Sequence, residues 1–155
     1  MTKKKILFIT DADNQVNGVV KTIYKLREQL IKDYSVEIVS HISFRTISFP
    51  LYTEIKLAIN PWRVFSIIEK TKPDYIHIFT EGPIGFFAKL YCIKNNIAHT
   101  SSYHTMFPEY LWNNYYIPRC ISYKYFKWFH NSSCSVLVPT KTMIEKLQSK
   151  GFHNL

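Results

Sequence analysis

The sequence predicts an α/β fold: a Rossmann-like, mostly parallel sheet with helices on both faces. Short apolar runs of strand length alternate along the chain with longer segments in which apolar residues recur at helical spacing. The first run, residues 5–10, is almost continuously apolar, as a strand buried on both faces requires. Glycine or proline separates several of these segments, which is typical of the turns between strands and crossover helices.

The first half of the chain is predicted to alternate strand and helix. The expected elements are a strand at 5–10, a helix from Val19 to about Asp33, a strand at 36–40, a helix that begins at Pro61, a strand at 75–79 and a helix at 83–94. Proline suits a first helical turn, which supports the helix start at Pro61. Residues 42–59 are predicted to be irregular because Pro50 interrupts them.

The second half continues the same alternation. It is predicted to hold a strand at 98–103, helical segments at 108–112 and 118–129, a strand at 135–138, and a helix from Thr140 that ends at Gly151. Glycine is the usual residue just past a helix end. The chain has 155 residues without an internal repeat or linker, so we expect a single domain.

The charge balance restricts the partners. The chain has 20 basic and 11 acidic residues, a formal net charge of +9. Nucleic acid, an anionic membrane surface and a phosphorylated substrate all attract such a protein, and a solvated basic surface remains a plain alternative. The sequence lacks a nucleic-acid-binding motif and a stripe of basic residues interleaved with stacking aromatics, so we expect no nucleic-acid partner.

Several features indicate a cytoplasmic protein. No stretch approaches the roughly 20 apolar residues that a membrane span needs. The apolar run after the lysines at 3–5 is too short for an export signal. Cys92, Cys120 and Cys134 lack metal or redox spacing, so we interpret them as reduced and mostly buried thiols. We expect no metal and no cofactor.

In sheets of this kind, ligands bind beyond the carboxyl ends of the strands. The loops after Thr10, Phe79 and Tyr103 are therefore the candidate site. In the first, Gly18 stands where strand gives way to helix and would let backbone amides approach an anion such as a phosphate. A plain turn glycine is the alternative interpretation. A G-x-G-x-x-G dinucleotide motif is absent.

The second loop contains Glu81, between a strand end and a helix start. Its carboxylate could accept hydrogen bonds from sugar hydroxyls, or it could cap the following helix. Gly82 and Gly85 bracket the first turn of that helix. His77, inside the preceding strand, is interpreted as a core histidine with satisfied hydrogen bonds.

The third loop places His104 just past a strand end in a polar and aromatic cluster. Histidine can donate to a substrate oxygen or exchange protons near neutral pH. Tyr103 and Tyr110 offer platforms for a sugar ring. The alternative is a capping loop in which Ser102 and Thr105 satisfy backbone groups.

Five segments together carry a family resemblance. In order they are Asn17-Gly-Val-Val20, Pro73-Asp74, Thr80-Glu-Gly-Pro-Ile-Gly85, Ser102-Tyr-His-Thr105 with Phe107-Pro-Glu-Tyr110, and Val138-Pro-Thr140. This set closely resembles the N-terminal domain of the family 4 glycosyltransferases, which have the GT-B fold, and it looks like bacterial enzymes of the mannosyltransferase and sulfolipid-synthase type. The resemblance covers nearly the whole chain.

The resemblance implies a retaining enzyme with two Rossmann-like domains, in which this half holds a lipid-linked or glycan acceptor and the other half holds the nucleotide-sugar donor. Transfer would require no metal. The loop of Asn17, Gly18 and Val19 would lie by the donor diphosphate, and His104 would be the catalytic group beside the transferring sugar. The acceptor side would be lined by Glu81, Gly82, Tyr103, Thr105 and Tyr110.

The sequence ends about where the connection to the donor-binding domain would begin. We therefore expect residues 1–155 to form only the acceptor-side domain, inactive alone, with the donor-binding domain on a separate chain or lost. A truncated chain, a split gene and a decayed remnant remain open. So does a non-catalytic module that binds through its basic and aromatic residues.

An aromatic and basic segment at 112–129 suggests a further partner. Aromatic rings beside lysine and arginine suit the headgroup region of a membrane. The candidate contacts are Arg119, Lys124, Lys127 and Trp128, which would hold the domain peripherally on the inner face of the cytoplasmic membrane. Alternatively, Ile121, Phe126 and Phe129 pack under the sheet, and the other domain covers the rest.

Overall fold

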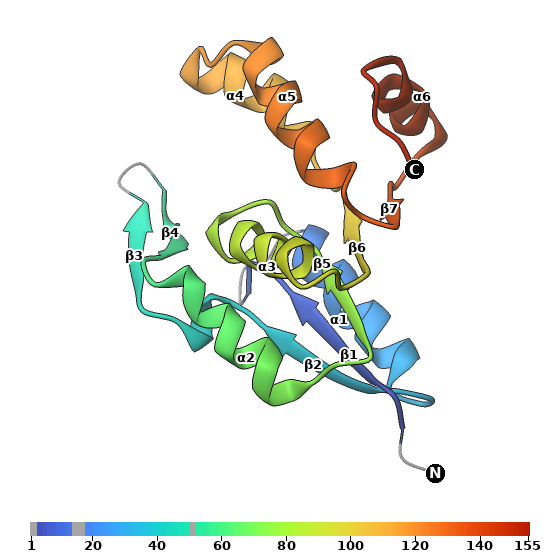
Figure 1. The fold of residues 1–155 in the computed structure, drawn as a ribbon. Helices are drawn as coiled ribbons and strands as arrows, with labels where there is room; N and C mark the ends of the chain where they lie inside the picture. Colours follow the sequence, from blue (N-terminus) through green and yellow to red (C-terminus); the bar gives the residue numbers. More distant parts are fainter. Residues whose placement is uncertain (1–2, 14–17, 50–51) are drawn as a thin grey trace.

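The computed structural model describes residues 3–13, 18–49 and 52–155. Within these residues the chain forms a five-stranded sheet in the order β2-β1-β5-β6-β7 and a separate two-stranded sheet of β3 and β4. All pairings in the larger sheet are parallel. The larger sheet and its helices confirm the predicted α/β, Rossmann-like fold class (Figure 1).

An inner strand of the larger sheet is β1 (Lys5–Ile9), which lies between β2 (Ser35–Val39) and β5 (Tyr75–Ile78). Alternate β1 side chains face opposite sides because successive residues of a strand point to opposite faces. Ile6 and Phe8 pack with α1 (Gly18–Leu30) on one face. Leu7 and Ile9 pack with α2 (Val64–Thr71) and α3 (Pro83–Lys94) on the other. Both faces are therefore covered, as the continuous apolar run predicts.

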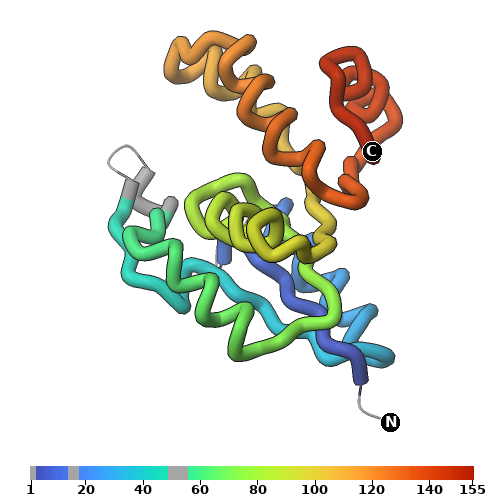
Figure 2. The backbone as a smooth tube through the Cα atoms, in the orientation of Figure 1, coloured from blue at the N-terminus to red at the C-terminus, as the bar shows by residue number. Residues whose placement is uncertain are grey.

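The rest of the chain forms one end of the molecule, beside β6 (His99–Ser102) and β7 (Ser135–Leu137). Here α4 (Phe107–Tyr115), α5 (Arg119–His130) and α6 (Lys141–Ser149) gather together (Figure 1). Figure 2 shows the chain turning back on itself between α4 and α5. The core of this end is a separate apolar cluster built on Tyr103, Phe126, Val136, Leu147 and Phe152.

The prediction that 42–59 is irregular is wrong. After a short 3-10 helix, His41–Ser43, residues Thr46–Phe49 (β3) and Tyr52–Ala58 (β4) pair as antiparallel strands. Apolar and polar residues alternate along much of both strands, which is the period expected of a hairpin. A second 3-10 helix, Pro61–Arg63, then leads into α2, so proline does stand at a helix start.

The thiols differ in exposure. Cys92 is buried, whereas Cys120 and Cys134 are exposed, and all three are free. The expectation that they are mostly buried is therefore wrong. Among the described residues, no helix is both long enough and apolar enough to cross a membrane.

Candidate functional site

The candidate site lies where β1, β5 and β6 end at one edge of the sheet. These strands are neighbours in the order β1-β5-β6 and run parallel, so the loops that follow them emerge side by side. The loops bring Asp11, Glu81 and His104 to this edge. The Glu81 carboxylate acts electrostatically on both other groups.

Asp11 caps the N-terminus of α3. Its carboxylate accepts hydrogen bonds from the backbone N–H groups of Ile84 (2.7 Å) and Gly85 (3.2 Å) and from the Thr80 hydroxyl (2.9 Å). Helix N-termini leave such N–H groups without intrahelical partners, and an aspartate satisfies them well. Burial raises the pKa of the Asp11 carboxyl to about 6, and these hydrogen bonds oppose the rise. The helix cap is thus Asp11 and not Glu81.

The two glycines of this turn make room for the cap. A Cβ on Gly82 would lie 2.5 Å from Cγ of Asp11, and a Cβ on Gly85 would overlap the Thr80 carbonyl oxygen. Close packing therefore explains both glycines: Gly82 lies against the β1 loop, and Gly85 lies against the end of β5 and the loop that follows it. Gly82, predicted on the acceptor side, has this structural reason to lack a side chain.

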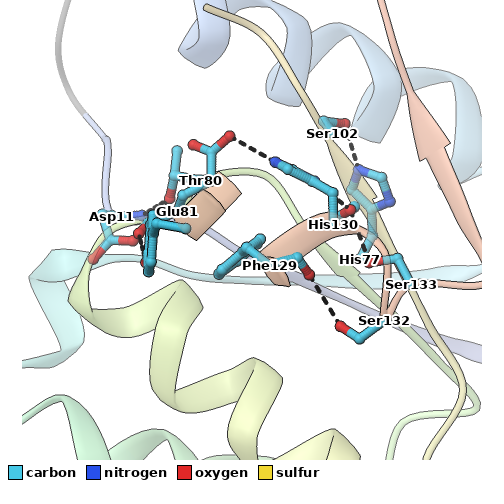
Figure 3. A network of polar contacts seen from close by, with 11 residues as sticks. Asp11, His77, Thr80, Glu81, Ser102, Phe129, His130, Ser132 and Ser133 are labelled. Carbon is cyan, nitrogen blue, oxygen red and sulfur yellow. Dashed lines mark hydrogen bonds and ion pairs between the residues drawn. The ribbon is translucent and has the colours of Figure 1, made fainter. Parts of the chain in front are cut away.

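Glu81 instead pairs with His130 at the end of α5. The Glu81 Oε1 and His130 Nε2 atoms are 3.0 Å apart, and the two side chains are 6% and 0% exposed (Figure 3). The other ring nitrogen of His130 lies 2.9 Å from the Ser101 hydroxyl, which accepts a hydrogen bond from Ser133 at 2.8 Å. The predicted acceptor residue is thus one end of a buried polar chain.

The hydrogen-bonded series of Glu81, His130 and Ser101 has the acid–histidine–serine order of a hydrolase triad. A nucleophile must reach its substrate, but Ser101 and His130 are both fully buried. The arrangement therefore does not support serine hydrolysis.

His104 directly follows the buried Tyr103 and lies at the sheet edge. Its ring stacks on Phe79, with centroids 5.9 Å apart and planes at 8°. Burial lowers the pKa of His104, while the Glu81 carboxylate raises it, so the neutral imidazole predominates at pH 7. Its Nε2 atom is buried and has no hydrogen-bond partner among the described residues. The ring is therefore fixed in place with one polar atom unused.

His77 is the core histidine that its place in a strand predicts. Its ring nitrogens lie 2.6 Å from the Thr100 hydroxyl and 2.7 Å from the Ser102 hydroxyl. Burial lowers the pKa of His77 to about 4, which keeps it neutral. With both nitrogens occupied, this side chain does not take part in the candidate site.

The predicted diphosphate loop is described only in part. Gly18 is the first residue of α1 and is exposed, and no described atom comes within 4 Å of a Cβ built on it. Val19 is half-buried against the sheet. Asn17 lies outside the described residues. The folded chain itself therefore leaves space for a side chain at Gly18, in contrast to Gly82 and Gly85.

The remaining predicted acceptor residues have different surroundings. Tyr103 is fully buried, edge-on to Phe126 and Phe152, so in contrast to the expectation its ring is not available as a sugar platform. Thr105 is half-buried in a bend before α4. Tyr110, on α4, is 38% exposed and presents part of its ring at the surface.

The predicted membrane contacts all lie on α5. Arg119, Lys124 and Trp128 are exposed and Lys127 is half-buried. Other exposed apolar side chains of this hairpin are Trp112, Tyr116, Ile117 and Ile121. The α4–α5 hairpin thus combines basic and large apolar groups on its surface. In the described parts of the chain, no group of three or more potential ligands could hold a metal ion.

Two site residues were missed by sequence reasoning. Asp11 directly follows a buried strand, and the distant helix start at Gly82-Pro83 has no side-chain cap of its own, so the two together are a usable signal. His130 lies 49 residues from Glu81, and no local pattern connects the two.

Comparison with known protein families identifies a relationship for nearly the whole chain. A family model described as Glycosyltransferase Family 4 matches residues 16–154, nearly the whole chain. No curated protein matches.

Proposed function

This chain belongs to glycosyltransferase family 4, and on that premise we propose that it forms the acceptor-side domain of a retaining GT-B glycosyltransferase. The proposed reaction transfers a sugar from a nucleotide-sugar donor to a lipid-linked or glycan acceptor, in the manner of mannosyltransferases or sulfolipid synthases. The donor is held by a second domain, which this chain meets as part of the same enzyme or as a separate chain.

The observation that carries this proposal is the state of His104. It lies at the carboxyl edge of a parallel sheet, where ligands bind in such folds, and its Nε2 has no partner among the described residues. A buried polar atom without a partner is costly unless a ligand completes it. The lowered pKa keeps the ring neutral, so Nε2 can hydrogen-bond to a hydroxyl of the transferring sugar.

The neighbouring loops supply the other contacts of the proposed site. The N-terminus of α1 at Gly18 and Val19 directs backbone N–H groups and a positive helix end toward the donor diphosphate. Asn17, which lies outside the described residues, is proposed as part of the same loop. Fixed dipoles of this kind stabilise the charge that develops on the leaving diphosphate. Glu81, Thr105 and Tyr110 face the acceptor.

The surface of the α4–α5 hairpin suggests a location for the protein in the cell. We infer that the α4–α5 hairpin contacts the anionic inner face of the cytoplasmic membrane through Arg119, Lys124, Lys127 and Trp128. The observation in favour is that basic and large apolar side chains share this exposed surface. A non-catalytic binding module would use the same surface, so the transfer assay below separates the two functions.

The test is sugar transfer by this chain combined with a donor-binding domain of the family. Radiolabelled UDP-sugars and GDP-sugars are offered with a bacterial lipid extract as acceptor. We expect labelled lipid from the combination and none from either domain alone, because each domain supplies only part of the proposed site. Robust transfer by the purified chain alone, or none from any combination that forms a stable complex, would contradict the proposal.

A further inference from the structure

The end of α5 carries a buried histidine that touches the proposed acceptor residue. His130 is fully buried and is the last residue of the helix. Its Nε2 atom lies 3.0 Å from the Glu81 carboxylate, and its Nδ1 atom lies 2.9 Å from the Ser101 hydroxyl. Both ring nitrogens are therefore in use, and Figure 3 shows the ring pointing toward Glu81.

The hydrogen bonds that join Ser133, Ser101, His130 and Glu81 can all run in one direction. Ser133 donates to Ser101 at 2.8 Å, which leaves the Ser101 hydroxyl hydrogen for Nδ1 of His130. A neutral ring that accepts at Nδ1 carries its proton on Nε2 and donates it to Glu81. Ser101 and Ser133 therefore fix both the orientation of His130 and its tautomer, as outer partners do for metal-binding histidines.

A second contact from α5 holds the backbone of Glu81. The Tyr125 hydroxyl donates to the Glu81 carbonyl oxygen at 2.8 Å. One helix thus holds both the main chain and the side chain of this residue. The other carboxylate oxygen, Oε2, has no hydrogen-bond partner among the described residues. The carboxylate is fixed at one oxygen and available at the other.

We propose that His130 is a positioning residue: it holds the Glu81 carboxylate so that the free oxygen faces the acceptor hydroxyl. This inference rests on the proposed function, in which Glu81 lines the acceptor side. A free glutamate would sample several rotamers, and its carboxylate would be correctly placed for only part of the time. Pre-ordering it lowers the entropy lost when the acceptor binds.

A purely structural role makes a different prediction. If His130 only filled the core, any polar substitute of similar size would act alike, whatever atom it presented to Glu81. A positioning role depends on a donor at the place of Nε2. Two amide side chains separate these roles, because the glutamine amide reaches about as far as Nε2 and the asparagine amide about as far as Nδ1.

The variants are therefore His130→Gln, which can still donate to Glu81, and His130→Asn, which can reach only Ser101. In the combined enzyme, kcat and KM for the lipid acceptor are measured for both. We expect His130→Asn to lose about 10–100-fold in kcat/KM, by analogy with the loss when an outer partner that orients a metal-binding residue is removed. His130→Gln should stay within about threefold of the parent. Equal losses in both variants would overturn the proposal.

A second readout uses the chain alone. Three-bond NMR couplings to Cγ of Glu81 report its χ1 rotamer. We expect one rotamer in the parent and in His130→Gln, and averaging in His130→Asn. An unchanged rotamer in His130→Asn would contradict the proposal. If this variant does not fold, Ser101→Ala replaces it, with loosening of Glu81 expected and an unchanged rotamer contradictory.

The two readouts separate the two claims. Absence of transfer by the parent enzyme would overturn the proposed function, while the couplings would still decide whether His130 orders Glu81. Normal transfer with a freely averaging Glu81 in the parent would overturn the positioning role alone.

Discussion

The sheet edge and the α4–α5 hairpin use polar and apolar groups in opposite ways. At the edge, the Asp11 and His130 side chains have hydrogen-bond partners, while among the described residues of these loops the Tyr103 hydroxyl and the His104 Nε2 atom are buried without one. On the hairpin, large apolar side chains such as Trp112 and Ile121 are exposed beside cations. The edge thus concentrates short directional polar contacts, and the hairpin concentrates exposed apolar and basic surface.

This difference has a physical consequence for mutations. Groups at the edge are held by short directional contacts, so small changes there should have large effects. Groups on the hairpin act through summed area and charge, so single changes should have small and additive effects. The predictions below test that contrast.

The largest effect is expected at His104. Replacing it with alanine in the combined enzyme should reduce turnover by about two to four powers of ten, the range for a positioned acid–base or electrostatic group. Turnover is measured at saturating donor, with the fold checked by circular dichroism. A folded variant within threefold of the parent would exclude a catalytic role.

Next in size is the effect of Gly85→Ala on stability. The added Cβ would overlap the Thr80 carbonyl oxygen, and such overpacking should cost about 2–3 kcal/mol. Gly18→Ala is the matched control, since its Cβ meets no described atom and alanine favours a helix. Urea unfolding measures both. Similar midpoints for the two variants would show that the edge packs less tightly than described.

A smaller effect concerns the contact between the edge helix α3 and the hairpin. Lys89 is fully buried and donates to the Trp128 carbonyl at 2.7 Å, and burial lowers its pKa to about 7. The unfolded chain, with a pKa near 10.5, binds more protons between pH 7 and 10.5. The free energy of unfolding should therefore rise with pH across this window, by at most about 1.4 kcal/mol per pH unit.

Lys89→Met should remove that component of the slope, whereas Lys94→Met, an exposed lysine on the same helix, should keep it. Urea unfolding at several pH values measures the slopes. Equal slopes for the parent and Lys89→Met would show that Lys89 stays charged when buried.

The smallest effect per residue is expected on the hairpin. Each basic group near an anionic surface contributes about 1 kcal/mol, so replacing Arg119, Lys124 and Lys127 with glutamine should weaken vesicle binding by about fivefold per residue. Co-sedimentation with phosphatidylglycerol vesicles, at low and high salt, measures this. Glutamine at Lys21 and Lys25 of α1 and at Lys32, just after this helix, is the control. Equal binding to neutral vesicles, or equal loss in the control, would leave the hairpin as an interface for another protein.

The sequence predicts the larger sheet well because each strand carries its own local signal. The apolar runs at β1 and β5 and the helical spacing in α1 do not depend on distant residues. The β3–β4 hairpin is harder to predict, because Pro50 interrupts the alternation of apolar and polar residues that indicates its two strands.

The site is harder to predict because its contacts join residues far apart in the chain. Asp11 reaches Ile84, and Glu81 reaches His130, through the sheet order and not through any local spacing. The tertiary fold also determines which side chains are exposed. Tyr103 and His104 both follow the same strand, and the sequence does not indicate that Tyr103 is the one enclosed in the core.

The most direct test of the central claim is an amide NMR titration of this chain with octyl β-glucoside as an acceptor mimic and with UDP-glucose and GDP-mannose as donor mimics. If the sheet edge is the acceptor side of a transfer site, shifts should concentrate at residues 80–82 and 103–106 for the acceptor mimic, and near Gly18 for the nucleotides. Shifts confined to the α4–α5 hairpin, with the edge loops unchanged at millimolar ligand, would contradict the account.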